Sequence, residues 1–259
     1  MTPSAQPFYT VQLDIGGVAW EARVNDAPLF AEMRGFNTRT ELPLNRWIRN
    51  GANRLSLRFR PRPGQAEIPA STRLSAVVYV REFGADRQSR REVGRLDYPG
   101  PAADGDGARI SEMSFLAQVP FPPFLWFSSE TIDETEQTRL VLAREVERFH
   151  DWLAAKDLDA IVRTMAVRDR EDSSATYSTV DEQVQNTRNT YGFFLDGYYE
   201  LRPALTATAR LRIYGDKRLA GLELSNGKSP LYYRMGAGDV AAYLPLLFCR
   251  CQGAWVIIR

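Results

Sequence analysis

The residues of this chain that carry reactive side chains are few and scattered. His150 is the only histidine, and Cys249 and Cys251 are the only cysteines. A zinc site takes about four Cys, His or carboxylate ligands, so this set does not suggest one. A catalytic triad has to use His150, and no nucleophile is marked beside it. We therefore expect no metal, no catalytic residue and, since phosphate-binding and dinucleotide-binding motifs are missing, no cofactor.

Seven polar side chains remain as candidates for the lining of a small-molecule pocket: His150, Asp151, Asp196, Tyr198, Tyr199, Tyr232 and Tyr233. A histidine or carboxylate in an apolar pocket can act as a base. The alternative for His150 is a half-buried helix residue that hydrogen-bonds a neighbour, and we favour it. Tyrosines at sheet positions are more often core or rim residues.

Two acidic residues, Asp104 and Asp106, stand in a glycine-rich run. Two carboxylates without a distant glutamate are too few for a calcium loop.

Cys249 and Cys251 are spaced so that both lie on one face of a strand, and two buried thiols on that strand are the simplest interpretation.

Arginine and aromatic side chains are the stronger candidates for binding. Arg87, Arg90 and Arg91 gather near the tip of a predicted hairpin, where they can meet an acidic partner or simply be solvated. The run PFPPFLWFSS, residues 120–129, contains Trp126 and is too apolar for an exposed linker. We expect it to pack between two domains, and an aromatic recognition strip is the alternative.

The composition is that of a folded protein without a dominant charge. Of its 259 residues 44% are apolar, and the 33 basic and 32 acidic residues give a net charge of +1. Nucleic acid is therefore not an expected partner. Only three of the basic residues are lysine, an arginine bias that favours a bacterium with a GC-rich genome. The sequence shows no secretory signal and no run of about 18 apolar residues, so we expect a cytoplasmic protein outside the membrane.

The stretch 131–165 is predicted to hold two helices. Thr131 and Glu134 have the spacing of a capping box, so the first helix is expected to begin there. Its apolar residues share one stripe, which needs a cover: Leu142, Val146, Phe149 and Leu153. Asp157 is expected to cap the second helix.

The remaining segments are predicted from their periodicity. A third helix is expected after Ser178 or Thr179, and residues 168–174 are expected to form a loop. Alternating strands are predicted before and after the helices, including a hairpin with its turn at Gly16-Gly17, a strand pair across residues 73–97 and a final hairpin turning at Gln252-Gly253.

Residues 43–59, PLNRWIRNGANRLSLRF, resemble an edge of galactose-binding-like jelly-roll sandwiches, where a phrase "lN.wl..G.N.l.l" precedes a strand. The matching residues are Leu44, Asn45, Trp47, Ile48, Gly51, Asn53, Leu55 and Leu57. The resemblance implies a sandwich. It leaves the ligand open, because such folds host many functions.

The second half resembles the ketosteroid-isomerase-like, or SnoaL-type, α+β cone. The matching residues are Phe149, Trp152, Leu153, Asp157, Leu158, Ile161, Gly253, Trp255 and Ile257. The resemblance implies helices packed on a curved antiparallel sheet. Enzymes of this family place an Asp or His base inside the cone, for which this chain offers His150, Asp151 or Asp196.

Together these patterns predict a mainly β protein with α+β character: a β-sandwich domain at 1–119, an aromatic and proline-rich connector at 120–129, and a cone-like domain at 130–259. We expect a non-enzymatic protein that binds another protein, such as a bacterial immunity or accessory protein that occludes its partner. The alternatives are a small-molecule enzyme or binder of the cone type and a carbohydrate-binding sandwich. The sequence leaves the oligomeric state open.

Overall fold

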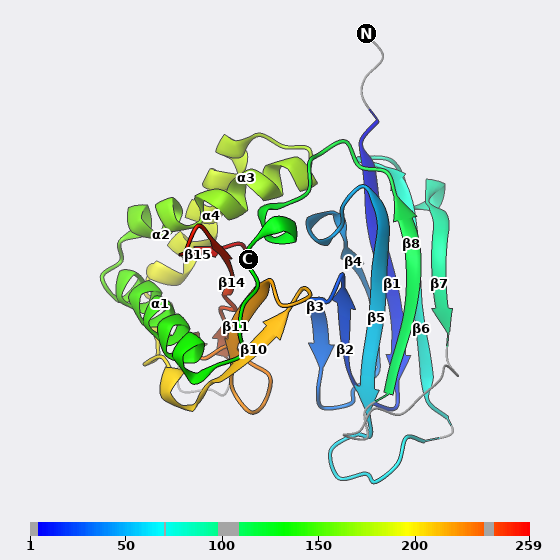
Figure 1. Cartoon of the computed structure of the whole chain (residues 1–259), viewed down its shortest axis with the longest axis horizontal. Helices are drawn as coiled ribbons and strands as arrows, with labels where there is room; N and C mark the ends of the chain where they lie inside the picture. The colour runs from blue at the N-terminus through cyan, green and yellow to red at the C-terminus, as the bar shows by residue number, and fades with distance from the viewer. Residues whose placement is uncertain (1–4, 70, 98–108, 236–240) are drawn as a thin grey trace. The chain divides into compact units, whose positions relative to one another are not determined.

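The computed structural model describes residues 5–69, 71–97, 109–235 and 241–259 (Figure 1). In these ranges the chain forms four β-sheets and four α-helices, so the expectation of a mainly β protein with α+β character is confirmed. Two compact units are formed. Unit 1 is Met1–Pro123 with Ala175–Tyr177, and unit 2 is Phe124–Ser174 with Ser178–Arg259. None of the helices in the described ranges has the length and apolarity that crossing a bilayer requires.

Unit 1 contains two antiparallel four-stranded sheets. The first has the order β4 (Thr38–Pro43), β1 (Pro7–Gly16), β6 (Arg73–Glu82), β7 (Arg91–Asp97). The second has the order β3 (Ala27–Glu32), β2 (Ala19–Val24), β5 (Gly51–Arg60), β8 (Arg109–Ala117). On β5, Leu55, Leu57 and Phe59 are buried and the residues between them are not, as the two-residue period of a strand requires.

The hairpin predicted at Gly16-Gly17 is wrong. Strand β1 pairs with β4 and β6, whereas β2 pairs with β3 and β5, so the two glycines carry the chain from one sheet to the other. A Cβ on Gly16 would lie 2.5 Å from Asn37 Oδ1, which shows how closely the chain approaches there. Two segments of alternating apolar and polar residues joined by a turn can form either a hairpin or a crossover between two sheets. Which of the two forms depends on the strands with which each segment pairs.

Two buried asparagines of the segment 43–59 hold the chain before and inside β5. Asn45 Oδ1 accepts a hydrogen bond from the Tyr9 N–H (2.8 Å), and its Nδ2 donates to the Pro7 carbonyl (3.1 Å). Asn53 Nδ2 donates to the Arg49 carbonyl (2.8 Å). Asn45 and Asn53 therefore have a structural role in unit 1.

Unit 2 holds the helices α1 (Glu136–Ala154), α2 (Leu158–Thr164), α3 (Ala166–Ala175, its last residue excepted) and α4 (Val180–Leu195). One sheet has the order β10 (Arg210–Tyr214), β11 (Leu219–Glu223), β14 (Leu247–Cys251), β15 (Ala254–Ile257). The other has the order β13 (Ala241–Tyr243), β12 (Tyr232–Met235), β9 (Tyr199–Leu201). The final hairpin, β14 with β15, is confirmed.

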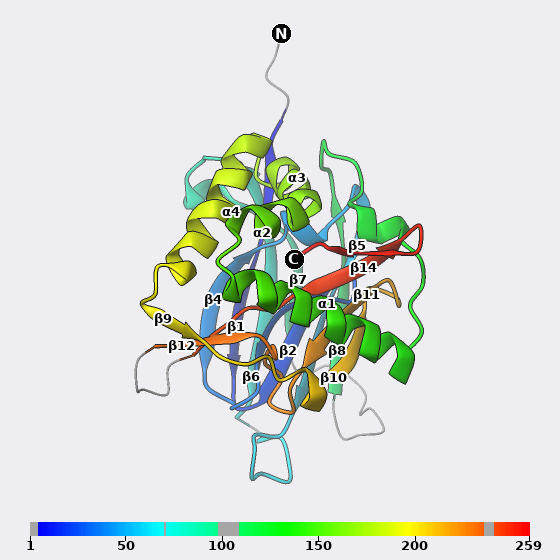
Figure 2. The same ribbon diagram turned by 90° about the vertical axis from the view of Figure 1, so that its left-hand side faces the viewer.

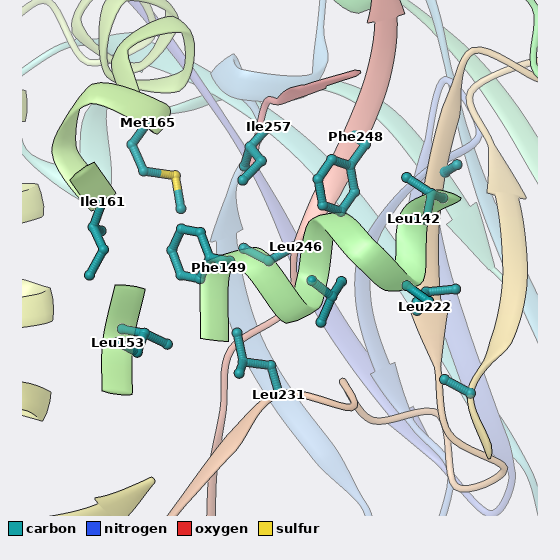
Figure 3. Close-up of a cluster of buried hydrophobic side chains, with 14 of the residues drawn as sticks. Leu142, Phe149, Leu153, Ile161, Met165, Leu222, Leu231, Leu246, Phe248 and Ile257 are labelled. Carbon is teal, nitrogen blue, oxygen red and sulfur yellow. The ribbon is translucent and has the colours of Figure 1, made fainter. Parts of the chain in front are cut away.

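The apolar stripe predicted for α1 is the centre of the unit 2 core. All four of its residues are at most 2% exposed: Leu142, Val146, Phe149 and Leu153. Figure 2 shows α1 lying across the sheet of β10, β11 and β14. Leu222, Phe248 and Ile257 belong to the same buried cluster, as Figure 3 shows. The sheet therefore supplies the cover, and each large side chain buried this way contributes about 1.5–3 kcal/mol.

Helix α1 begins later than the capping box at Thr131 and Glu134 predicted. Its N-cap is Thr135, whose side chain accepts a hydrogen bond from the Thr138 N–H (3.1 Å). The Ile132 N–H donates instead to the Lys217 carbonyl (2.6 Å), and Ile132 is 3% exposed in the core. This hydrogen bond and the buried side chain of Ile132 keep the residues before Thr135 out of the helix.

We predict that Thr135→Ala lowers the free energy of unfolding by about 1 kcal/mol, the usual cost of losing an N-cap. Thr131→Ala is the matched control, and it is expected to change stability by less than about 0.5 kcal/mol. Urea unfolding at neutral pH measures both. An equal loss in the two variants would contradict the observed cap.

The loop predicted at residues 168–174 is also wrong, because these residues form most of α3. Its acidic side chains are buried with partners. Asp169, 1% exposed, accepts hydrogen bonds at Oδ1 from Thr187 Oγ1 (2.7 Å) and Arg168 Nη2 (2.9 Å). The sequence of this run is typical of a loop because partners such as Thr187, which lies on α4, come from distant parts of the chain.

Arg259 provides the counter-charge for two further acids of α3. Its Nη1 lies 3.4 Å from Glu171 Oε2 and 3.5 Å from Asp172 Oδ1, and all three side chains are at most 12% exposed. Burial raises the pKa of Glu171, and Arg259 and the Leu125 N–H offset this only in part.

We predict that Arg259→Ala lowers the free energy of unfolding by about 3 kcal/mol at pH 7, because it leaves buried carboxylates without a counter-charge. In a Glu171→Gln background the loss is expected to be smaller, since one of those charges is already gone. Urea unfolding of the four proteins measures this coupling. Equal losses in both backgrounds would show that the pair does not interact.

Candidate functional site

An exposed aromatic surface lies where the chain passes from α4 to β9. Phe193 is 54% exposed and Tyr198 is 69% exposed. Both pack against Tyr199, with ring centroids 5.3 Å apart in each case. We call these three residues the aromatic triad. Gly197, with φ of +90°, allows the chain to reverse after the helix.

The triad rests on the core of unit 2. Phe194 lies 5.5 Å from Tyr199 and stacks on Tyr233 at 5.0 Å between ring centroids. Burial, and then Tyr191, raise the pKa of Tyr233 to about 12, so this hydroxyl is neutral at physiological pH. Phe194 and Tyr199 both pack against the buried cluster around α1. The two exposed rings are therefore held on a well-packed base.

Three of the predicted pocket residues, Asp196, Tyr198 and Tyr199, lie at this surface. Asp196 directly follows α4, and its side chain is exposed. His150 Nε2 donates to the carbonyl of Arg202, the residue after β9, at 3.2 Å. The side chain of Asp151 is 82% exposed, and its Oδ1 lies 3.8 Å from His150 Nδ1. His150 thus fastens α1 to the end of β9, while the two aspartates face solvent and not the apolar core.

The arginines of the predicted hairpin tip are partly neutralised. Arg90 Nη1 donates to Glu41 Oε2 (2.6 Å), Arg87 forms an ion pair with the same oxygen, and the Arg90 guanidinium lies 4.0 Å from the Tyr79 ring centroid. Arg90 is half-buried, whereas Arg87 is 63% exposed in its side chain. Arg91, the first residue of β7, is exposed. The three residues are neighbours but do not form one free basic patch.

Trp126 and Tyr232 are not members of the triad. Trp126 is 2% exposed inside a short 3₁₀ turn and stacks on Phe127 with centroids 3.8 Å apart. Its ring therefore packs within unit 2 and is not presented at the surface. Tyr232 stacks on Tyr243 across β12 and β13 at 5.7 Å.

The thiols of Cys249 and Cys251 lie on β14 with their sulfurs 3.9 Å apart. Burial, and then the neighbouring Cys251, raise the pKa of Cys249, which disfavours the reactive thiolate. No group of three or more His, Cys, Asp or Glu side chains suited to a metal occurs among the described residues. Asp104 and Asp106 lie outside them.

Comparison with protein-family models, with curated proteins and with solved structures found no match for this chain. The resemblances to jelly-roll sandwiches and to cone domains therefore stay predictions. The sequence analysis identified Tyr199 as a candidate but not Phe193. A signal was present, because Phe193 falls two positions after the buried Tyr191 and so points away from the buried side of α4.

The pKa of Glu41 provides a test of the arginine contacts. Burial works to raise this pKa, but the hydrogen bond from Thr10 and the charges of Arg90 and Arg87 outweigh it and lower the pKa below its ordinary value. A carboxyl with a lowered pKa stabilises the folded state fully above its unfolded pKa of about 4.3. That contribution is lost as the pH falls through the folded pKa.

We predict that Glu41→Gln lowers the free energy of unfolding by about 1.5 kcal/mol at pH 7. The difference from the unchanged protein is expected to shrink as the pH falls through the lowered pKa of folded Glu41, because the protonated carboxyl and the amide are both uncharged. Urea unfolding at several pH values measures it. Glu112→Gln is the control, since Glu112 is half-exposed and lies 4.0 Å from Arg54. A difference that does not change with pH would contradict the lowered pKa.

Proposed function

We propose that this chain is a non-enzymatic protein that binds another protein through the aromatic triad. The exposure of Phe193 and Tyr198 carries the proposal. Aromatic rings that fill a partner's pockets supply much of the energy of protein interfaces. A cytoplasmic bacterial immunity or accessory protein that occludes its partner is the form of this function that we favour.

The arrangement of the triad supports this proposal. Tyr199 is fixed by Phe194 and the core, so the flanking rings lose little freedom on binding. Asp196 beside them offers a solvated carboxylate, and interfaces commonly have a polar rim around an aromatic centre.

The two alternatives have less support. An isomerase-like site needs a polar group inside an apolar cavity, but Asp151 and Asp196 are exposed and the core beneath α1 is packed with side chains. Sugar binding by unit 1 needs exposed aromatic rings near the loops of Trp20 or Trp47. Trp20 is 1% exposed and Trp47 is half-buried, and of their aromatic neighbours Phe30, which stacks on Trp20 at 5.5 Å between ring centroids, is 39% exposed.

For the fold we propose that unit 1 is a β-sandwich and that unit 2 is a cone-like domain with helices on a curved antiparallel sheet. The two four-stranded sheets of unit 1, with their buried apolar residues, support the first assignment. The packing of α1 on β10 and β11 supports the second.

We predict that the double variant Phe193→Ser, Tyr198→Ser loses partner binding while its stability changes little, because both rings are largely exposed. Tagged protein is used to capture partners from a lysate of the source cells, with quantitative mass spectrometry as the readout. A partner recovered with the unchanged protein is expected to fall by about tenfold or more with the double variant. Calorimetry with the purified partner then measures the affinity.

Phe36→Ser is the matched control, because Phe36 is an aromatic residue of unit 1 that is 57% exposed. It is expected to retain the partner. The same set of partners at the same yield with all three proteins would exclude the triad as the binding site. For an immunity role, co-expression with the partner is expected to protect cells, and only when the triad is intact.

A further inference from the structure

The outer strands of the two sheets of unit 1 are protected to different degrees. Strand β7 carries Val93 as an extra residue opposite β6, which is a β-bulge. Strand β3 contains Pro28 and an irregular register with β2. Strand β4 is six residues long and ends at Pro43. Bulges, prolines and short length are the usual means by which proteins prevent edge strands from pairing with other chains.

Strand β8 has none of these protections. Its nine residues pair with β5 from Arg109 to Ala117 without a shift in register and without proline. Near its end, Leu116 is 74% exposed, more than any other large hydrophobic residue in the described chain. A long, regular edge with an exposed apolar side chain is a surface on which another strand can add.

An open groove of about 720 Å³ lies between β7 and the end of β8, lined among others by Arg91, Glu92, Ser114 and Leu116. The charge of Glu92 is balanced within the chain, because Arg95 Nη2 donates to its Oε2 (2.6 Å). A Cβ on Gly94 would lie 3.2 Å from Met113 Cε, so the glycine lets β7 approach β8 closely. Arg91 is exposed and forms no ion pair with the residues that the structure describes. An occupant that matches this groove brings an extended backbone, an apolar side chain and an acidic side chain.

We propose that the occupant is strand β8 of a second copy of this chain, antiparallel to the first and centred on Met113. In this register all nine residues of each strand are paired. Ile110 of one copy lies opposite Leu116 of the other, an apolar pair. Glu112 of one copy lies opposite Ser114 of the other. Ser114 and Arg91 line the same groove, so the Glu112 carboxylate of one copy faces the Arg91 guanidinium of the other.

The neighbouring registers fit worse. Only shifts that keep the same side chains on the buried face are allowed, and these are centred on Glu112 or on Ser114. Centring on Glu112 places the two Glu112 carboxylates opposite each other. Centring on Ser114 places Glu112 opposite Leu116. The register of greatest overlap is therefore also the one in which charges and apolar groups match.

The mass of the full chain in solution tests the dimer. Light scattering over a dilution series is expected to give a mass that rises with concentration toward twice the 29.3 kDa of one chain. Leu116→Lys is expected to weaken the dimer by roughly tenfold or more, because it removes both apolar pairs. The matched control is Leu140→Lys on α1, where Leu140 is 41% exposed, and it is expected to leave the dimer unchanged.

Charge exchange separates the proposed contact from a general effect on folding. Arg91→Glu is expected to weaken the dimer, and the double variant Arg91→Glu, Glu112→Arg is expected to restore it, with circular dichroism confirming that all variants are folded. A chain that stays monomeric at every concentration overturns the proposal. So does a dimer that neither Leu116→Lys nor Arg91→Glu weakens.

Cysteine crosslinking tests the register. A mixture of Glu112→Cys and Ser114→Cys proteins is expected to form a disulfide-linked dimer under mild oxidation, because these positions are directly opposite. Each variant alone, and the unchanged protein with its native Cys249 and Cys251, are the controls. Crosslinking that is no greater in the mixture than in the controls contradicts pairing centred on Met113.

Discussion

The packing of the α1 stripe on its sheet is the interaction on which unit 2 depends. A helix with one apolar face is not stable by itself in water, and the sheet of β10, β11, β14 and β15 has an apolar face of its own to bury. Phe149 is central, since it contacts Trp152 and Tyr191 as well as the sheet cluster. Helices α1, α2 and α4 and two sheets thereby share one core.

The candidate binding surface depends on the same core. Phe194 and Tyr199 are packed beneath the surface, and through them Phe193 and Tyr198 are fixed outside it. His150 adds a hydrogen bond between α1 and the residue after β9. The histidine that first suggested catalysis therefore helps to position the surface for which we propose binding.

Unit 1 follows a different constraint, because sheets end in edges whose backbone groups have no partner strand. Three of its outer strands carry a bulge, a proline or both, whereas β8 is regular. Arg87 and Arg90 of unit 1 form ion pairs with Glu41, so the free charge of that region is smaller than the sequence indicates. Interaction at β8 and at the aromatic triad would use separate surfaces, one in each unit.

The sequence by itself determined the features that arise from local spacing. The stripe of α1, the Asp157 and Thr179 caps, the strand pair of β6 with β7 and the final hairpin follow from periods and cap chemistry within a few residues. Tyr198 and Asp196 were found as candidates, but their position beside Phe193 was not. Only the tertiary structure decided that β1 and β2 belong to different sheets, that residues 168–174 form a helix with buried acids, and that α1 starts after Thr135. In each case the deciding partner lies far away in the chain, and the energy of burial or of a buried ion pair exceeds the local preference.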